Sequence, residues 1–176
     1  MIVSGDEPRA LLINGTVGSG KTTTADLVGE LLRERAVPHA VIDLDWLRNA
    51  WPAPADDPFH TRLTWANLES VAGHFRRVGA RRLVLAGVIE TADERRRYED
   101  AVGMPLSVVR LVVDLGSVRE RLLRRHPAGE GLDWHLHRSG ELEAILAAAG
   151  VDDVIIEVGD DEAAVIAERV LAAVGW

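Results

Sequence analysis

The stretch INGTVGSGKTTTADL, from Ile13 to Leu27, decides the fold of this chain. It contains the segment GTVGSGKT, Gly15 to Thr22, which matches the pattern G-x-x-x-x-G-K-[ST]. The apolar run Ala10–Asn14 comes before it and predicts a buried strand. After it, Leu27 and Leu31 are separated by one helical turn, which predicts an amphipathic helix. A glycine-rich turn between a strand and a helix is the local context that this pattern requires.

The lysine in this turn is unusual because it is the only lysine in the chain. Lys and Arg together number 20 among 176 residues, and all except Lys21 are arginine. Glycines let backbone N–H groups wrap around an anion, and the following helix adds a partial positive charge. A compact ammonium can lie over such a loop and touch nucleotide phosphates, whereas the planar arginine fork is bulkier. A turn of purely structural use is the alternative. We predict that ATP is bound here by Gly15, Thr16, Val17, Gly18, Ser19, Gly20, Lys21, Thr22 and Thr23, with Thr22 at Mg²⁺.

Short β-rich runs alternate with longer helical patterns along the chain, which predicts a parallel sheet flanked by helices. Strands are expected at Ala10–Asn14, Ala40–Leu44, Arg82–Val88, Val108–Val113 and around Ile155. Helices are expected from Lys21, over Thr61–Arg77, after the N-cap Thr91, from Ser117, and over Asp161–Val174. We expect a single α/β domain over residues 1–176. It would include an irregular acceptor-side insert at about 49–60. It would also include a lid at about 119–140, in which residues 126–140 are expected to be irregular.

Composition limits the classes of function. The chain has 47% hydrophobic and 27% charged residues, a formal net charge of −8 and no cysteine. It contains no apolar run of the roughly 18 residues that a membrane span needs, and its first residues lack the basic region of a secretory signal. Disulfides and thiolate metal sites are excluded. We therefore expect a cytoplasmic protein, monomer or homodimer, without membrane or nucleic-acid partners, since a net negative charge opposes binding to a polyanion.

Two other classes of phosphate-loop protein are disfavoured. GTP-binding switch proteins need the guanine-reading motif N-K-x-D, and the single lysine is already in the phosphate loop. Mechanical ATPases usually end an apolar strand in Asp or Asp-Glu, but the run LVLAGVIE has Gly87 there and reaches Glu90 only three residues later. Both observations favour a different kind of nucleotide-binding enzyme.

The stretch VIDLDWLRNAWP carries two carboxylates and an arginine. If the strand continues through this stretch, Asp43 and Asp45 project to the same side, toward the phosphate loop. One carboxylate there could accept the proton of an attacking hydroxyl, while another holds Mg²⁺. Arg48 could bind an anionic or polar part of the acceptor. The alternative for Asp45 is that it caps a helix from Trp46 onward, a role that does not exclude catalysis.

These segments resemble P-loop small-molecule kinases, in particular chloramphenicol phosphotransferase and adenylylsulfate kinase. LLINGTVGSGKTTTADLVGELL is similar to the opening strand, loop and helix of the phosphotransferase. VIDLDWLRNAWP is similar to its D-x-L-x-x-A-x-P stretch, and also to the D-G-D-x-x-R stretch of adenylylsulfate kinase. The resemblance implies that Asp45 is the general base, with Asp43 and Arg48 beside it. It also implies a nucleoside-monophosphate-kinase-like fold with strand order 2-3-1-4-5. The aromatic-proline substrate strand and lysine-rich lid of adenylylsulfate kinase are absent.

The remaining candidate residues lie in the insert, in the lid and after the last strand. Arg121 and Arg125 share a helical face and could stabilise the transferring phosphoryl group, although a solvated helix face explains them equally well. Aromatic residues of the insert region could line an acceptor pocket or pack the insert on the core. They are Trp51, Phe59 and Trp65. Gly159 follows the last strand, where the nucleotide base could contact the backbone.

Together these observations predict a P-loop kinase that moves the γ-phosphoryl group of ATP, with Mg²⁺, to a hydroxyl of a small molecule. The acceptor could be an antibiotic, a nucleoside, a sugar or a similar compound. The alternative is a regulatory module that binds ATP and phosphorylates nothing. The carboxylates Asp43 and Asp45 favour the kinase, because a binding module needs no base.

Overall fold

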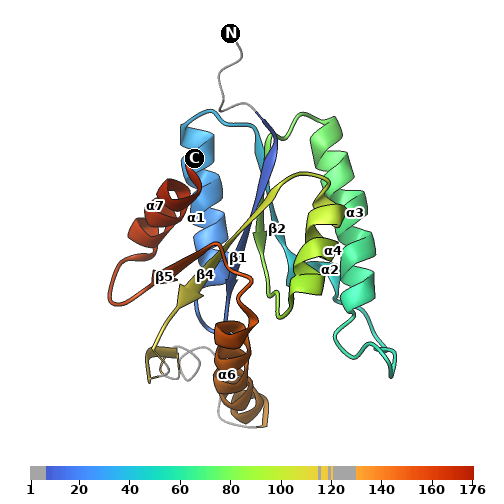
Figure 1. Cartoon of the computed structure of the whole chain (residues 1–176), viewed down its shortest axis with the longest axis vertical. Coiled ribbons are helices and arrows are strands. Elements are labelled where there is room, and N and C mark those ends of the chain that lie inside the picture. Colours follow the sequence, from blue (N-terminus) through green and yellow to red (C-terminus); the bar gives the residue numbers. More distant parts are fainter. Residues whose placement is uncertain (1–6, 115, 119, 121–129) are drawn as a thin grey trace.

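The computed structural model describes residues 7–114, 116–118, 120 and 130–176, with the side chains of 130–138 left out. Its centre is a parallel sheet of five strands in the order β2-β3-β1-β4-β5 (Figure 1). This confirms the predicted fold class and strand order. The strands are β1 (Arg9–Gly15), β2 (His39–Asp43), β3 (Arg82–Ala86), β4 (Leu106–Val112) and β5 (Val154–Glu157).

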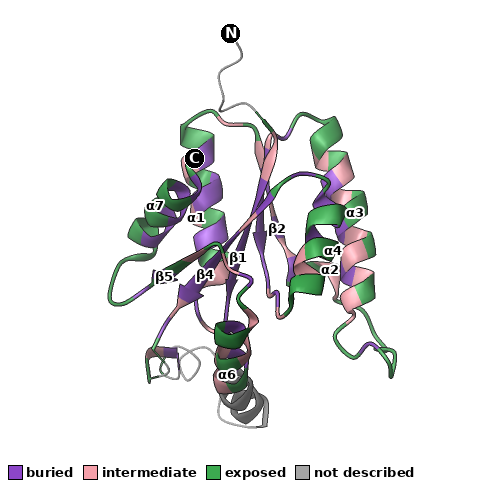
Figure 2. Cartoon of the chain, viewed as in Figure 1, coloured by how far each residue is buried: buried purple, intermediate pink, exposed green. Residues whose placement is uncertain are grey.

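Helices cover both faces of the sheet (Figure 1). On one face lie α1 (Lys21–Glu34) and α7 (Ala163–Val174), and on the other lie α3 (Thr61–Arg77) and α4 (Ala92–Val102). Because helices pack on both faces of the sheet, its central strands must be apolar on both sides. Accordingly, β1 is buried from Ala10 to Gly15. Alternate residues of β1 enter separate cores: Leu11 and Ile13 pack with α1 and α7, and Ala10 and Leu12 with α3 and α4. Figure 2 shows this burial concentrated on the strands and on the inward helix faces.

The helix α6 (Glu130–Ala149) corrects one prediction, because residues 126–140 were expected to be irregular. Pro127, Gly129 and Gly131 suggested a loop. However, Pro127 and Gly129 lie outside the described residues, and Gly131 falls in the first turn of α6, where glycine does little harm. The sequence after Gly140, ELEAILAAA, is rich in strong helix formers and carries the helix onward.

The insert is irregular, as predicted: residues 49–60, all of them described, form neither helix nor strand. Its acidic residues have local structural roles. Asp57 is buried, and its carboxylate accepts hydrogen bonds from the backbone N–H groups of Thr61 and Arg62 at 2.7 and 3.1 Å, which caps the start of α3. Asp56 forms an exposed ion pair with Arg62 at 2.8 Å. Among the described helices, none is long and apolar enough to cross a membrane.

Gly87, at the end of β3, is required by packing rather than by chemistry. A Cβ atom built there overlaps the buried side chain of Leu44, which begins the short helix α2 (Leu44–Leu47). We expect Gly87→Ala to lower the free energy of unfolding by about 1–3 kcal/mol, measured by urea denaturation, because an overpacked core must shift. Gly140→Ala, within α6, is the matched control: apart from the backbone of its own helix, no atom of the described residues lies within 4 Å of the added methyl group, so its stability should equal or exceed that of the wild type. A Gly87→Ala protein as stable as the wild type would contradict this packing.

Candidate active site

The phosphate loop joins β1 to α1 and has the backbone conformations that its glycines allow. Gly18 and Gly20 have φ of 79° and 95°, in the left-handed region that other residues avoid. Gly15 has φ of 145°, and a Cβ atom there would lie 2.7 Å from the carbonyl oxygen of Leu111. The Lys21 ammonium folds back over the loop and donates hydrogen bonds to the carbonyl oxygens of Gly15 and Thr16, both at 2.9 Å. The loop therefore holds its single cation at the centre of the site.

Burial makes the charge of Lys21 costly. Desolvation lowers the pKa of Lys21 from 10.5 to about 8, although the nearby carboxylates of Asp45 and Asp43 act in the opposite direction. Part of the side chain still reaches the cleft, so bound phosphates would restore favourable interactions to the ammonium.

This lowered pKa gives a testable pH dependence. If the protonated lysine binds ATP, kcat/KM for ATP should fall above pH 8, about tenfold per pH unit, because that parameter reports the free enzyme. The free energy of unfolding should change in the opposite sense. Between pH 8 and 10.5 the unfolded chain retains a proton that the folded chain has released, so stability should rise with pH. Denaturant titrations at pH 7 and 9.5 measure this rise, which Lys21→Met should lack.

Two carboxylates lie beside the loop at the end of β2. One oxygen of Asp43 accepts a hydrogen bond from the Thr22 hydroxyl at 2.8 Å, and the other accepts one from the backbone N–H of Asp45 at 2.9 Å. Asp43 is therefore the N-cap of α2, and the suggested cap at Asp45 is wrong. The strand also ends before Asp45, so strand alternation does not explain its position. Asp45 lies in the first turn of α2 and still faces the cleft.

The Thr22 hydroxyl and the Asp43 carboxylate fit Mg²⁺, which prefers oxygen ligands and usually retains several waters and substrate phosphates. Among the described residues there is no group of three or more His, Cys, Asp or Glu side chains that could hold a metal ion alone. A site with few protein ligands is what Mg²⁺ bound with a nucleotide requires.

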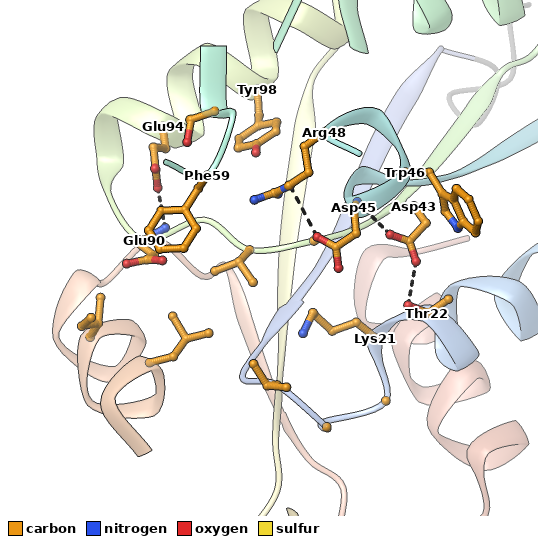
Figure 3. A pocket seen from close by; sticks show the side chains of 18 of the residues that line it. Lys21, Thr22, Asp43, Asp45, Trp46, Arg48, Phe59, Glu90, Glu94 and Tyr98 are labelled. Atoms are coloured by element: carbon orange, nitrogen blue, oxygen red, sulfur yellow. Dashed lines mark hydrogen bonds and ion pairs between the residues drawn. The ribbon is translucent and has the colours of Figure 1, made fainter. Parts of the chain in front are cut away.

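A cleft of about 940 Å³ extends from the phosphate loop past the two carboxylates (Figure 3). Ten residues predicted for the site line it, and they come from the loop, α1, the end of β2, α2 and the insert. They are Val17, Gly18, Gly20, Lys21, Thr22, Thr23, Asp43, Asp45, Arg48 and Phe59. The structure therefore brings part of the phosphate loop and four of the predicted acceptor residues, Asp43, Asp45, Arg48 and Phe59, into one cavity.

Other predicted residues lie elsewhere. Trp51 is 91% exposed and does not line the cleft. Trp65 belongs to α3 and packs against the core that α3 and α4 cover. Its ring stands edge-on to the ring of Tyr98, with 6.3 Å between the ring centroids. This agrees with the alternative in which the aromatic residues pack on the core. Gly159 follows β5, away from the cleft lining. Arg121 and Arg125 lie outside the described residues.

Several lining residues have no recognisable signal in the sequence. From the loop after β3 and from α4 come Glu90, Glu94 and Tyr98, and α6 contributes Glu141, Leu142 and Ile145. Glu94 carries a local pattern, since it completes a capping box with Thr91, but that pattern predicts a helix start only. The capping box itself was predicted and is confirmed.

Asn14 is a supporting residue that the sequence predicts only as the end of a strand. It is fully buried, and its side-chain oxygen accepts hydrogen bonds from the backbone N–H groups of Gly15 and Ile89, at 2.9 and 3.2 Å. Its amide donates to the carbonyl oxygen of Ile89 at 3.3 Å and to Asp152 at 3.0 Å. The one polar residue at the end of an apolar strand was the available signal. Asn14 ties the start of the phosphate loop to the loop after β3.

No protein-family model matches this chain, and no curated protein matches its sequence. Solved structures do match it. The tunicamycin resistance protein of Deinococcus radiodurans is 22% identical, with a TM-score of 0.66 over 96% of each chain. The APS (adenylylsulfate) kinase of Mycobacterium tuberculosis, in complex with AMPPNP and APS, is 22% identical, with a TM-score of 0.65 over 97% of this chain and 99% of that one. A gluconokinase from Sinorhizobium meliloti 1021 is 18% identical, with a TM-score of 0.64 over 96% and 92%.

These matches extend over nearly the whole chain at low identity, so they show the fold. The resemblance to adenylylsulfate kinases that the sequence motifs suggested is thereby confirmed at the level of structure. This chain has the nucleoside-monophosphate-kinase-like fold of the P-loop small-molecule kinases, with its phosphate loop, carboxylate pair and cleft at the carboxyl edge of the sheet.

Proposed function

We propose that the protein is a phosphotransferase that moves the γ-phosphoryl group of ATP to a hydroxyl of a small molecule. The observation that carries the proposal is the position of the Asp45 carboxylate. It faces the same cleft as the Lys21 ammonium and the Thr22 hydroxyl, and its charge is the strongest carboxylate influence on the lysine. A phosphate site and a candidate base thus share one cavity, with Arg48 next to the base.

The chemistry follows from these positions. The acceptor hydroxyl would give its proton to Asp45 while its oxygen forms a bond to the γ-phosphorus, and the bond from that phosphorus to the β-bridging oxygen would break to release ADP. Lys21 and the loop N–H groups would stabilise the charge that develops on the phosphate oxygens. Bound Mg²⁺ would neutralise further phosphate charge, and Thr22 and Asp43 are the residues that would hold it.

Three parts of the site remain proposals. Arg121 and Arg125 would close over the phosphoryl group from a lid at about 119–140. Gly159 would contact the nucleotide base. Trp51, in the exposed insert, would contact an acceptor only when one is bound, whereas Trp65 lies behind Tyr98 and would support the acceptor pocket indirectly.

The alternative function is an ATP-binding regulatory module without kinase activity. A module of that kind needs the phosphate loop but has no use for Asp45, which the structure leaves largely exposed to the cleft with a side-chain exposure of 82%. A carboxylate at this place, ion-paired with Arg48 and open to the cleft, has a clear use as the base of a phosphoryl transfer. We therefore favour the kinase.

The experiment that tests this function is ADP release with ATP and Mg²⁺ against a panel of hydroxylated metabolites, sugars, nucleosides and antibiotics. The kinase predicts acceptor-dependent ADP release together with a phosphorylated product detected by mass spectrometry. Binding of the analogue AMPPNP in the absence of turnover with every acceptor would support the regulatory module instead.

A further inference from the structure

The cleft is lined by a tyrosine whose hydroxyl makes no hydrogen bond to a described residue. Tyr98, the only tyrosine in the chain, comes from α4 and is only 2% exposed, yet it lines the cleft. No described residue exchanges a hydrogen bond with its hydroxyl. The residue is almost entirely buried, yet it lines the cleft and its hydroxyl makes no hydrogen bond to a described residue, so the hydroxyl is available to a ligand group.

Arg48, the residue that follows α2, approaches the same place. Its guanidinium lies near the Tyr98 hydroxyl, with Asp45 on its other side (Figure 3). The Arg48 Nε atom is buried, lies 3.4 Å from an Asp45 oxygen and makes no hydrogen bond among the described residues. Arginine carries five N–H donors, and none of those of Arg48 donates to a described residue. Arg48 is therefore ion-paired with Asp45 through its Nε side, while its N–H groups make no hydrogen bond among the described residues and the side chain lines the cleft.

The chemistry of the two groups defines what they would bind. Arginine only donates. Desolvation raises the pKa of Tyr98 to about 12, so its hydroxyl keeps its proton at neutral pH and can donate as well. Two converging donors, one of them positively charged, are suited to a carboxylate. Asp45, on the other side of the guanidinium, is suited to the neighbouring hydroxyl that reacts.

We infer that Tyr98 and Arg48 form the acceptor subsite and bind a carboxylate beside the hydroxyl that is phosphorylated, so that the acceptor is a hydroxy acid. The inference rests on the proposed kinase function and adds a substrate class to it. Tyr98 is then a specificity-determining residue. Phe59, Leu142 and Ile145 line the same cleft and supply an apolar surface for the carbon skeleton of the acceptor.

The test compares hydroxy acids with matched polyols that lack the carboxylate: glycerate with glycerol, and gluconate with glucitol. Dissociation constants are measured by calorimetry in the presence of AMPPNP and Mg²⁺, and ADP release is measured with ATP. The variants are Tyr98→Phe and Arg48→Gln, and Arg33→Gln, at the exposed end of α1, is the matched control for the arginine change.

We expect at least one hydroxy acid to bind at least tenfold more tightly than its matched polyol. Tyr98→Phe should weaken acid binding by about 10–100-fold, because a hydrogen bond to a charged group is lost, and should leave AMPPNP and polyol binding unchanged. Its thermal unfolding temperature should not fall, since the hydroxyl has no protein partner to lose. A purely structural tyrosine would instead show equal acid binding in both proteins.

Three results would overturn the subsite. The first is equal binding of acids and polyols. The second is no acid binding by protein that binds AMPPNP, and the third is acid binding that Tyr98→Phe does not change. The subsite and the kinase function can also fail separately. Acid binding that depends on Tyr98 but gives no ADP release overturns the function and supports the subsite. Turnover of a neutral acceptor that does not depend on Tyr98 supports the function and overturns the subsite.

Discussion

A Lys21→Met variant is expected to lose about 10³-fold or more in acceptor-dependent ADP release, because the only ammonium at the phosphates is removed from a site where charge is poorly solvated. The lysine donates to two loop carbonyls and lies over the position that the loop offers to an anion. The protein should remain folded, since methionine has a similar length and removes a charge that burial disfavours. AMPPNP binding by calorimetry and ADP release by a coupled assay measure the effect.

Lys21→Arg separates the requirement for charge from the requirement for shape. It keeps the positive charge, but the planar fork cannot donate to Gly15 and Thr16 with the geometry of the ammonium, so most of the activity should still be lost. Arg33→Met, on the exposed end of α1, is the matched control and should behave like the wild type. Retention of more than a tenth of the activity by Lys21→Met would contradict the phosphate role.

An Asp45→Asn variant is expected to reduce kcat by about 10²–10⁴-fold with little change in AMPPNP binding. Asparagine has nearly the same shape as aspartate but cannot accept the proton of the acceptor hydroxyl. The expected pattern therefore separates chemistry from nucleotide binding. Single-turnover transfer at saturating ATP measures it, with the acceptor identified in the panel.

Two further variants control this result. Asp56→Asn changes an exposed acid of the insert that is paired with Arg62 and does not line the cleft, so its kcat should equal that of the wild type. Asp43→Asn should act differently from Asp45→Asn, because Asp43 contacts the Thr22 hydroxyl and caps α2. It should raise the Mg²⁺ concentration required for half-maximal activity. Full activity in Asp45→Asn would eliminate this residue as the base.

Most of the fold could be predicted from local patterns. The run ending at Asn14, the glycines up to Gly20 and the spacing of Leu27 and Leu31 each specify a conformation through nearby residues alone, and together they specify the strand, loop and helix of the phosphate site. The signal for the start of α4 also lies in neighbouring residues, since the side chains of Thr91 and Glu94 accept hydrogen bonds from the first backbone N–H groups of that helix. The helix α6 differs from the prediction over 130–140 because Gly131 and Gly140 favour a loop locally, whereas the helix formers from Glu141 onward carry the helix.

The sequence by itself therefore determined the phosphate loop, its single lysine, the parallel sheet and the carboxylates that follow β2, because each depends on residues adjacent in the chain. Only the tertiary structure decided which of those carboxylates caps a helix, why Gly87 must lack a side chain, and how Asn14 joins two loops. It also brought Tyr98 of α4 to Arg48, which follows α2 and lies fifty residues earlier in the chain. Such contacts depend on how helices pack across the sheet, and no periodicity or spacing in one segment encodes the partner that another segment will supply.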